Sequence, residues 1–157
     1  MIRPGTVEDA AAIAPLFREV QTMHAAQIPT VFKPPGELQG AVDWLEGVLA
    51  VPNIYSLVAE SDGQVVGYLM AQDVRREHSM FRPAHRYFML EHITVASAFQ
   101  DRGIGTKLMQ ALQAEAAARQ ITRIELEVWH FNQKAQRFFA RHGFRILSQR
   151  MEAVLPT

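Results

Sequence analysis

The sequence predicts an α/β (α+β) fold in which helices pack on one mixed sheet. Apolar residues recur at three- and four-residue steps in several segments, which indicates amphipathic helices. Alternating, β-rich segments lie between these helices, and Asp62-Gly63 predicts a tight hairpin turn between two of them. The resulting element order is β-α-α-β-β-β-α-β-α-β, which is typical of a sheet covered by helices. We expect residues 1–157 to form a single domain.

The first half of the chain contains two expected helices and four expected strands. Thr6-Val7-Glu8-Asp9 is close to a capping box, with Asp at the third position, and Pro15 predicts a kink or a broken turn in the first helix. Loops are expected at 27–36, which holds three prolines, and at the polar segment 74–86. In chain order, we expect a strand at 1–3, helices at 10–23 and 38–49, and strands at 54–61, 64–72 and 87–95.

The second half alternates helices and strands. A helix is expected at 104–119, with a strand at 121–129 after it. A second helix at 132–142 stops at Gly143, and a last strand follows at 144–155.

The composition excludes several classes of protein. Sixteen basic residues balance sixteen acidic ones, so no basic surface points to nucleic acid. No apolar run approaches the ~20 residues of a membrane span, and no signal peptide is recognisable. The lack of cysteine excludes disulfides, and the six histidines form no His-x-x-x-His or His-Glu-x-x-His motif, so we expect no metal. We therefore expect a cytoplasmic protein without nucleic-acid or membrane partners.

The segment from Gln100 to Thr106 is the most informative part of the chain. It lies where an expected strand ends and a helix begins, and it carries Gly103 and Gly105. Backbone N–H groups converge at such a junction, and glycine lets a phosphate approach the main chain closely. Leu108 stands where a dinucleotide fingerprint needs a third glycine, and no Walker motif is present. A tight turn without a ligand would also explain the two glycines.

Further motifs make the interpretation specific. Gln100-x-x-Gly103-x-Gly105 is preceded by Glu91-His92-Ile93-Thr94-Val95 and followed by Leu126-Glu127-Val128 and by Asn132-x-x-Ala135-x-x-Phe138-Phe139-x-x-x-Gly143-Phe144. In this order they resemble the motifs of the GCN5-related N-acetyltransferase (GNAT) superfamily. The resemblance implies a mostly antiparallel sheet that splits into a V, and an acetyl-CoA-dependent N-acetyltransferase. The acceptor would be a primary amine of a small molecule or peptide, attacking directly in a ternary complex.

The resemblance also implies where acetyl-CoA, the only cosubstrate expected, would bind. The pantetheine arm would lie along the backbone of Ile93, Thr94 and Val95, and a backbone N–H near Val95 would bind the oxyanion. The pyrophosphate would lie on the turn after that strand. Asn132 would contact the pantetheine, Ala135 would leave room for it, and Asn132 is also a natural helix N-cap. The residues that would hold the pyrophosphate are Gln100, Asp101, Arg102, Gly103, Ile104, Gly105 and Thr106.

Two glutamates are candidates for the base that deprotonates the amine. Strand alternation puts Glu91 on one side with Met89, Ile93 and Val95, where a carboxylate is costly unless it is paired or hydrated. Its position is similar to the proposed catalytic glutamate of diamine acetyltransferases in this superfamily. A salt bridge to Arg82, Arg86 or Arg123 is the alternative. Glu127 is the second candidate, similar to the glutamate of peptide α-amine acetyltransferases, although simple alternation with Glu125 also explains it.

Three further points concern activity and partners. Phe139 stands where the family usually has a tyrosine that protonates the leaving thiolate, which motivates the alternative of a non-catalytic acyl-CoA sensor. We expect the acceptor pocket to involve residues 22–37 and 74–86. His92 and His130 could relay protons beside the V-shaped split between the strands at 87–95 and 121–129. A homodimer is an open possibility, because homodimers are frequent in the superfamily.

Overall fold

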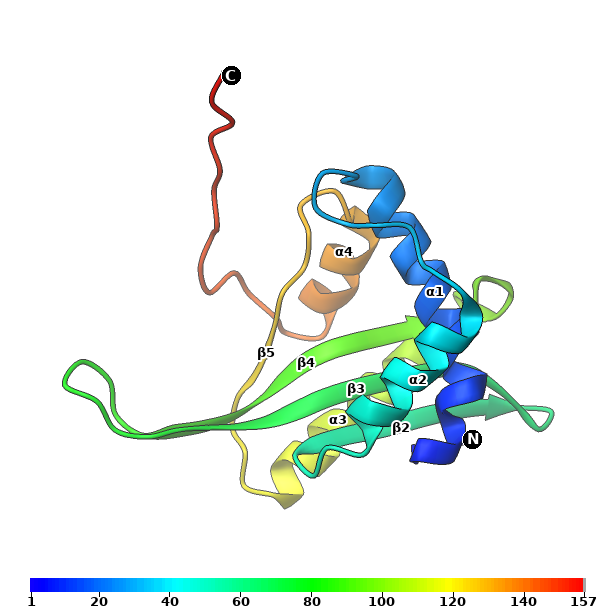
Figure 1. Cartoon of the computed structure of the whole chain (residues 1–157). Coiled ribbons are helices and arrows are strands. Elements are labelled where there is room, and N and C mark those ends of the chain that lie inside the picture. Colours follow the sequence, from blue (N-terminus) through cyan, green and yellow to red (C-terminus); the bar gives the residue numbers. More distant parts are fainter. Residues whose placement is uncertain (157) are drawn as a thin grey trace. The chain divides into compact units, whose positions relative to one another are not determined.

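The computed structural model describes residues 1–156 and falls into two compact units, Met1–Glu127 and Val128–Thr157. The first unit holds the whole sheet and three helices, and the second holds one helix (Figure 1). The family resemblance predicts that both belong to one domain, and this stays a prediction. None of the helices in residues 1–156 is long and apolar enough to cross a membrane.

The sheet has five strands in the order β1-β2-β3-β4-β5. Neighbouring strands are antiparallel except for β4 and β5, which are parallel. The predicted mixed, mostly antiparallel sheet is therefore confirmed. Its strands are β1 Ile2–Pro4, β2 Ile54–Ser61, β3 Gln64–Arg76, β4 His85–Val95 and β5 Ile124–Leu126.

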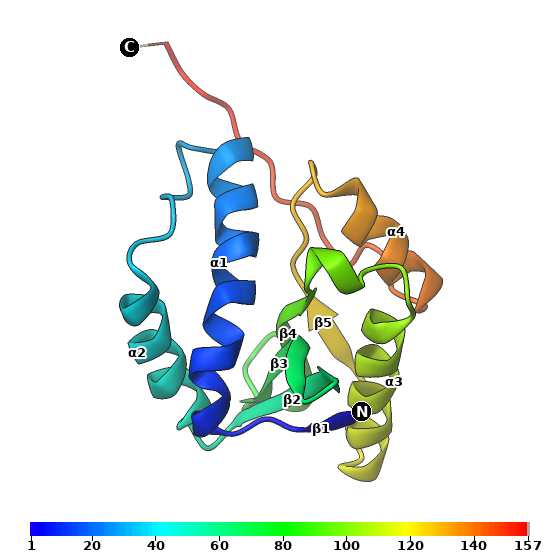
Figure 2. The same ribbon diagram turned by 90° about the vertical axis from the view of Figure 1, so that its right-hand side faces the viewer.

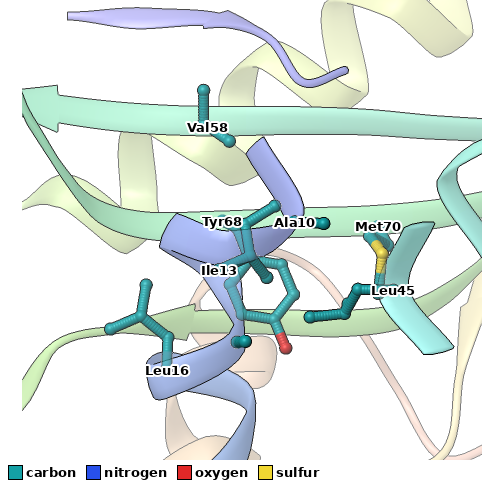
Figure 3. Packing of buried hydrophobic residues seen from close by; sticks show 8 residues of the cluster. Ala10, Ile13, Leu16, Leu45, Val58, Tyr68 and Met70 are labelled. Atoms are coloured by element: carbon teal, nitrogen blue, oxygen red, sulfur yellow. The ribbon is translucent and has the colours of Figure 1, made fainter. Parts of the chain in front are cut away.

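Helices cover both faces of this sheet. α1 (Ala10–Gln27) and α2 (Leu38–Leu49) lie on one face, and α3 (Ile104–Ala118) lies on the other (Figure 2). The core under α1 and α2 consists of small and branched side chains around the buried ring of Tyr68 (Figure 3). It includes Ala10, Ile13, Leu16, Leu45, Val58, Tyr68 and Met70. The buried side chains of α3 are Leu108, Met109, Leu112 and Ala116, at the spacing of one helix face.

The beginning of the chain is fixed by a charged capping arrangement. The Thr6 N–H donates to the Asp9 carboxylate at 2.8 Å, which confirms the capping box, although it caps a 3₁₀ turn (Val7–Asp9) that leads into α1. Arg3 donates to both oxygens of the same carboxylate, at 2.9 and 2.8 Å, and also to Glu60 on β2. The Arg3 side chain on β1 thus joins the 3₁₀ turn, through Asp9, to β2, through Glu60.

Several predicted boundaries are wrong. α1 continues through Pro15 and on to Gln27. Much of the expected loop 74–86 is strand, because β3 and β4 pair as far as Arg76↔His85, which leaves only 77–84 as the connection. β5 is confined to Ile124–Leu126 rather than 121–129, because only these residues pair with β4.

In the second unit, α4 (Gln133–Arg141) is close to its predicted range. Phe139 is buried and packs edge-on against Phe138 and Phe144. The predicted last strand is absent, because residues 144–156 pair with no neighbouring strand. Five large apolar side chains of this segment are exposed: Ile146, Leu147, Met151, Val154 and Leu155.

Candidate active site

The sheet opens between β4 and β5. The last pair between the two strands is Leu90↔Leu126, whereas β4 continues to Val95 while paired with β3 on its other side. Among residues 1–156, the far edge of β4 beyond Leu90 therefore has no strand partner. Backbone groups on such an edge can bind an extended ligand as an added strand would.

The hydrogen-bond pattern shows which backbone groups lie on this open edge. Ala96 N–H donates to Val66 O at 2.8 Å, so the neighbouring pair Gly67↔Val95 is a non-hydrogen-bonded pair of the antiparallel ladder. The N–H and C=O of Val95, and by alternation those of Ile93, therefore point away from β3. The backbone of Thr94 points toward Tyr68 on β3 instead. Of the three residues predicted to contact pantetheine, Ile93 and Val95 offer main-chain groups to the opening.

Glu91 lies at a β-bulge beside this opening. Met70 pairs with His92 and Ala71 pairs with Leu90, so Glu91 is the extra residue of β4. The expected alternation is therefore wrong: Ile93 shares a face with Leu90 rather than with Met89. A bulge breaks the two-residue period, and bulges commonly redirect a side chain next to an active site.

The structure brings the two candidate bases together. Glu127 follows the end of β5, in register with Glu91 one step beyond the last strand pair. Both side chains are exposed, yet partial shielding from water by the surrounding protein, together with the negative charge of Glu127, raises the pKa of Glu91. A carboxylate with a raised pKa at the point where two strands part is a suitable proton acceptor.

The salt bridges proposed as the alternative role of Glu91 are not formed. Arg86 donates to Asp73 through Nε at 2.8 Å, and Arg123 pairs with Glu125 at 2.8 Å. Within residues 1–156, Glu91 takes part in no ion pair. Its carboxylate therefore remains available for chemistry.

The segment from Gln100 to Thr106, which we call the glycine turn, lies shortly after the open edge of β4. Gln100 donates through Nε2 to Val95 O at 3.0 Å, so its side chain fastens the turn to the end of β4. Asp101 (φ 59°) and Gly103 (φ 77°) are both left-handed, and Gly103 is the N-cap of α3. Arg102 lies over the ring of Phe99 at 5.2 Å.

This backbone fits a pyrophosphate. Left-handed residues next to the start of a helix turn successive N–H groups to one side and form an anion-binding concavity. The first N–H groups of α3, at Ile104, Gly105 and Thr106, have no acceptor within the helix. A carbon added at Gly103 would meet no atom within 4 Å, so the space in front of the turn is open.

The remaining predicted contacts are in the second unit. The Asn132 side chain accepts a hydrogen bond from the Ala135 N–H at 3.1 Å, so its expected role as N-cap of α4 is confirmed. A contact of Asn132 or Ala135 with pantetheine stays a prediction. Phe139 is buried, whereas Phe138 is only half-buried and packs against His142, so Phe139 is the core ring of the pair.

One set of residues beside the opening was missed by the sequence analysis. The rings of Phe17, Trp44 and Tyr68 surround His92. These three residues lie outside the segments 22–37 and 74–86, and His24 of the first segment also acts on His92 electrostatically. Phe17 and Trp44 fit the apolar periodicity of their helices, so no local signal in the sequence distinguishes them from core residues. Residues 1–156 contain no group of three or more His, Asp or Glu side chains that could hold a metal ion.

Comparisons with known proteins agree with this geometry. The model of the Acetyltransferase (GNAT) family matches residues 19–144. An uncharacterised N-acetyltransferase of Bacillus subtilis, YhfO, is 27% identical over 91% of this chain and 88% of its own length. The L-amino acid N-acetyltransferase AaaT of Escherichia coli is 33% identical, over 66% of this chain and 60% of its own length.

Solved structures share the fold. The BH1408 protein of Bacillus halodurans superposes with a TM-score of 0.91 at 23% identity, covering 99% of both chains. The aminoglycoside acetyltransferase AAC(6')-Iy, solved with a CoA bisubstrate analogue, gives a TM-score of 0.74 at 17% identity, covering 100% of this chain and 98% of its own. The family match covers most of the chain, including the opening between β4 and β5 and the glycine turn. The chain is therefore an N-acetyltransferase of the Acetyltransferase (GNAT) family.

Proposed function

We propose that this protein transfers an acetyl group from acetyl-CoA to a primary amine of a small molecule or peptide by direct attack in a ternary complex. The observation that carries the proposal is the opening of the sheet beyond the pair Leu90↔Leu126. The open edge of β4 begins there, Glu91 with its raised pKa is the next residue, and the turn with left-handed Asp101 and Gly103 follows the end of the same strand. Each of these three features supplies one requirement of acetyl transfer from CoA to an amine.

The open edge and the turn would bind CoA. Pantetheine carries amide groups, which can pair with the main chain of Ile93 and Val95 as a strand would. The N–H groups from Asp101 to Thr106 would hold the pyrophosphate, with Gln100 keeping the turn in place through Val95 O. Asn132 and Ala135 would contact the pantetheine from the start of α4.

Glu91 would act as the base. The amine nitrogen must lose a proton before it attacks, and a carboxylate whose pKa is raised above its ordinary value accepts a proton more effectively than an ordinary one. The nitrogen then forms a bond to the thioester carbonyl carbon, and the C–S bond breaks. Glu127 would assist through its charge, since it contributes to the raised pKa of Glu91.

The remaining steps are the stabilisation of the oxyanion and the release of CoA. The Val95 N–H lies on the open edge and would donate to the oxyanion of the tetrahedral intermediate. CoA would leave as a thiolate and take a proton from water, because Phe139 is buried and carries no hydroxyl group. A thiolate is a good leaving group, so this step does not require a tyrosine.

The proposal is tested by following thiol release from acetyl-CoA with a panel of primary amines, alongside calorimetric titration of the protein with CoA. We expect saturable CoA binding and amine-dependent thiol release, with the N-acetylated product identified by mass spectrometry. CoA binding without turnover on any amine would favour the acyl-CoA sensor instead. A folded protein that does not bind CoA would overturn both assignments.

A further inference from the structure

Four rings from four different elements meet on the α1–α2 face of the sheet. We call Phe17 (α1), Trp44 (α2), Tyr68 (β3) and His92 (β4) the aromatic cluster. Phe17 stacks on Trp44 with ring centroids 4.9 Å apart, and His92 lies 5.6 Å from Phe17 and 6.1 Å from both Trp44 and Tyr68. These separations are in the range at which aromatic pairs attract one another.

The cluster begins one residue from the proposed base. His92 directly follows Glu91, so their Cα atoms are about 3.8 Å apart. Both residues lie beyond the last β4–β5 pair, where the sheet has opened. An acceptor whose amine lies at Glu91 and whose other end extends over the α1–α2 face would therefore meet the aromatic cluster.

The rings of the aromatic cluster differ in how far they are exposed to solvent. Tyr68 is fully buried, Phe17 and His92 are half-buried, and Trp44 keeps 46% of its surface exposed. An indole that stacks on another ring and still exposes nearly half of its surface offers apolar area to a ligand. The surface next to Glu91 on this face is thus aromatic.

The rings of the cluster carry no net charge near neutral pH. Burial, with a smaller contribution from His24, lowers the pKa of His92 to about 4, so its imidazole is neutral. Burial also raises the pKa of Tyr68, which keeps its hydroxyl proton. The Tyr68 hydroxyl and His92 Nδ1 are hydrogen-bonded at 3.3 Å, so each of these two polar atoms has a partner within the cluster. Such a surface favours an apolar group over a carboxylate, a phosphate or a second ammonium group.

We propose that the aromatic cluster binds the side chain of the acceptor, and that the acceptor is a primary amine with an aromatic or large aliphatic group close to its nitrogen. This inference rests on the proposed function and names its substrate class. An α-amino acid with an apolar side chain meets the description. The relative AaaT is named an L-amino acid N-acetyltransferase, which is compatible with that class.

The first test compares matched acceptors with the wild-type protein. Phenethylamine and ethylamine differ by one phenyl ring, and L-phenylalanine and L-alanine differ in the same way. We expect kcat/KM to be at least about tenfold higher for the aromatic member of each pair, since filling an apolar pocket discriminates by about 10- to 200-fold per group. Equal values within both pairs would overturn the inference while leaving amine acetylation intact.

The second test locates the pocket. Trp44→Ala should remove most of the preference: the kcat/KM for phenethylamine should fall far more than the kcat/KM for ethylamine, so that the ratio of the two approaches one. Trp44→Phe, which keeps a ring, should retain most of the preference. Phe81→Ala is the matched control, because Phe81 is an aromatic side chain that is 88% exposed on the β3–β4 connection and outside the aromatic cluster.

The outcomes separate the inference from the function on which it rests. A preference that survives Trp44→Ala, or that falls equally in Phe81→Ala, would show that the acceptor binds elsewhere. Turnover of neither phenethylamine nor ethylamine by a protein that binds CoA would overturn the inference and the proposed enzymatic function together.

Discussion

At the scale of single residues, the candidate site depends on the surroundings of Glu91. The sequence selects this glutamate as a candidate, because its motif resembles that of known acetyltransferases, and its role as the base stays a prediction. The bulge at Glu91 and the nearness of Glu127 were not predictable, since both arise from pairing with strands that lie far away in the chain. The same holds for Trp44 and His92, which belong to different elements and meet only in the fold.

The first prediction concerns the proposed base. Replacing Glu91 with Gln removes the proton acceptor and keeps the shape, so kcat at neutral pH should fall by about 10²- to 10⁴-fold. The dissociation constant for CoA, measured by calorimetry, should not change. Glu125→Gln is the control, because Glu125 is a nearby carboxylate that is paired with Arg123. Unchanged turnover in Glu91→Gln would assign the base to Glu127 or to solvent.

The second prediction concerns the pH dependence of the reaction. The charge of Glu127 contributes to the raised pKa of Glu91, so Glu127→Gln should lower that pKa. The base then loses its proton at lower pH, and the acidic limb of the kcat/KM profile should shift to lower pH. Of the other nearby groups, Glu125 is paired with Arg123, and His92, with a pKa of about 4, is neutral. A loss of activity at every pH would instead identify Glu127 as the base.

At the scale of elements, local patterns predicted those parts that local interactions determine. The range of α2 and the hairpin turn at Asp62-Gly63 agree with the structure, because helix periodicity and turn chemistry are encoded within a few residues. The ranges of β5 and of the expected strand at 144–155 were wrong. A strand exists only where a neighbour accepts its hydrogen bonds, and no local pattern specifies that neighbour.

The third prediction tests the turn before α3. Gly103 and Gly63 have almost the same positive φ, 77° and 75°, and an added Cβ would meet no atom within 4 Å at either position. Alanine should therefore lower the free energy of unfolding similarly at both, by about 1–2 kcal/mol. Only Gly103→Ala should weaken CoA binding, because Gly103 lies in the proposed pyrophosphate-binding turn, whereas Gly63 lies in the β2–β3 hairpin. Equal CoA affinity of the two variants in calorimetry would contradict a pyrophosphate site at this turn.

At the scale of the whole molecule, what could be predicted decreases further. The family resemblance predicts a single domain and leaves a homodimer open, and both statements stay predictions. The exposed apolar side chains at Ile146, Leu147 and Met151 were expected inside a strand. Association of units or of copies depends on the complementarity of whole surfaces, which a pattern read along one segment does not encode.

The fourth prediction concerns global stability, because Asp9 binds both the Thr6 N–H and Arg3, and Arg3 also binds Glu60 on β2. Its carboxylate is 7% exposed, and its hydrogen bonds with Arg3 hold its pKa below the ordinary value, against the effect of burial. A depressed pKa contributes stability that is present above the unfolded-state pKa of about 3.9 and is lost as the pH falls through the folded-state pKa. Asp9→Asn should therefore lower the free energy of unfolding at pH 7 by about 1.5–3 kcal/mol, as for other hydrogen bonds to charged groups.

Urea denaturation at several pH values checks this prediction and its sign. The difference between wild type and Asp9→Asn should be largest at neutral pH and should shrink below about pH 4, where Asp9 begins to bind a proton in the unfolded state while it is still ionised in the folded state. Asp62→Asn is the matched control, since it also removes one negative charge but lies in the hairpin turn, where Asn-Gly is favoured. Equal stability of the two variants at neutral pH would show that the bonds from Arg3 and Thr6 contribute no more than a hydrated surface carboxylate does.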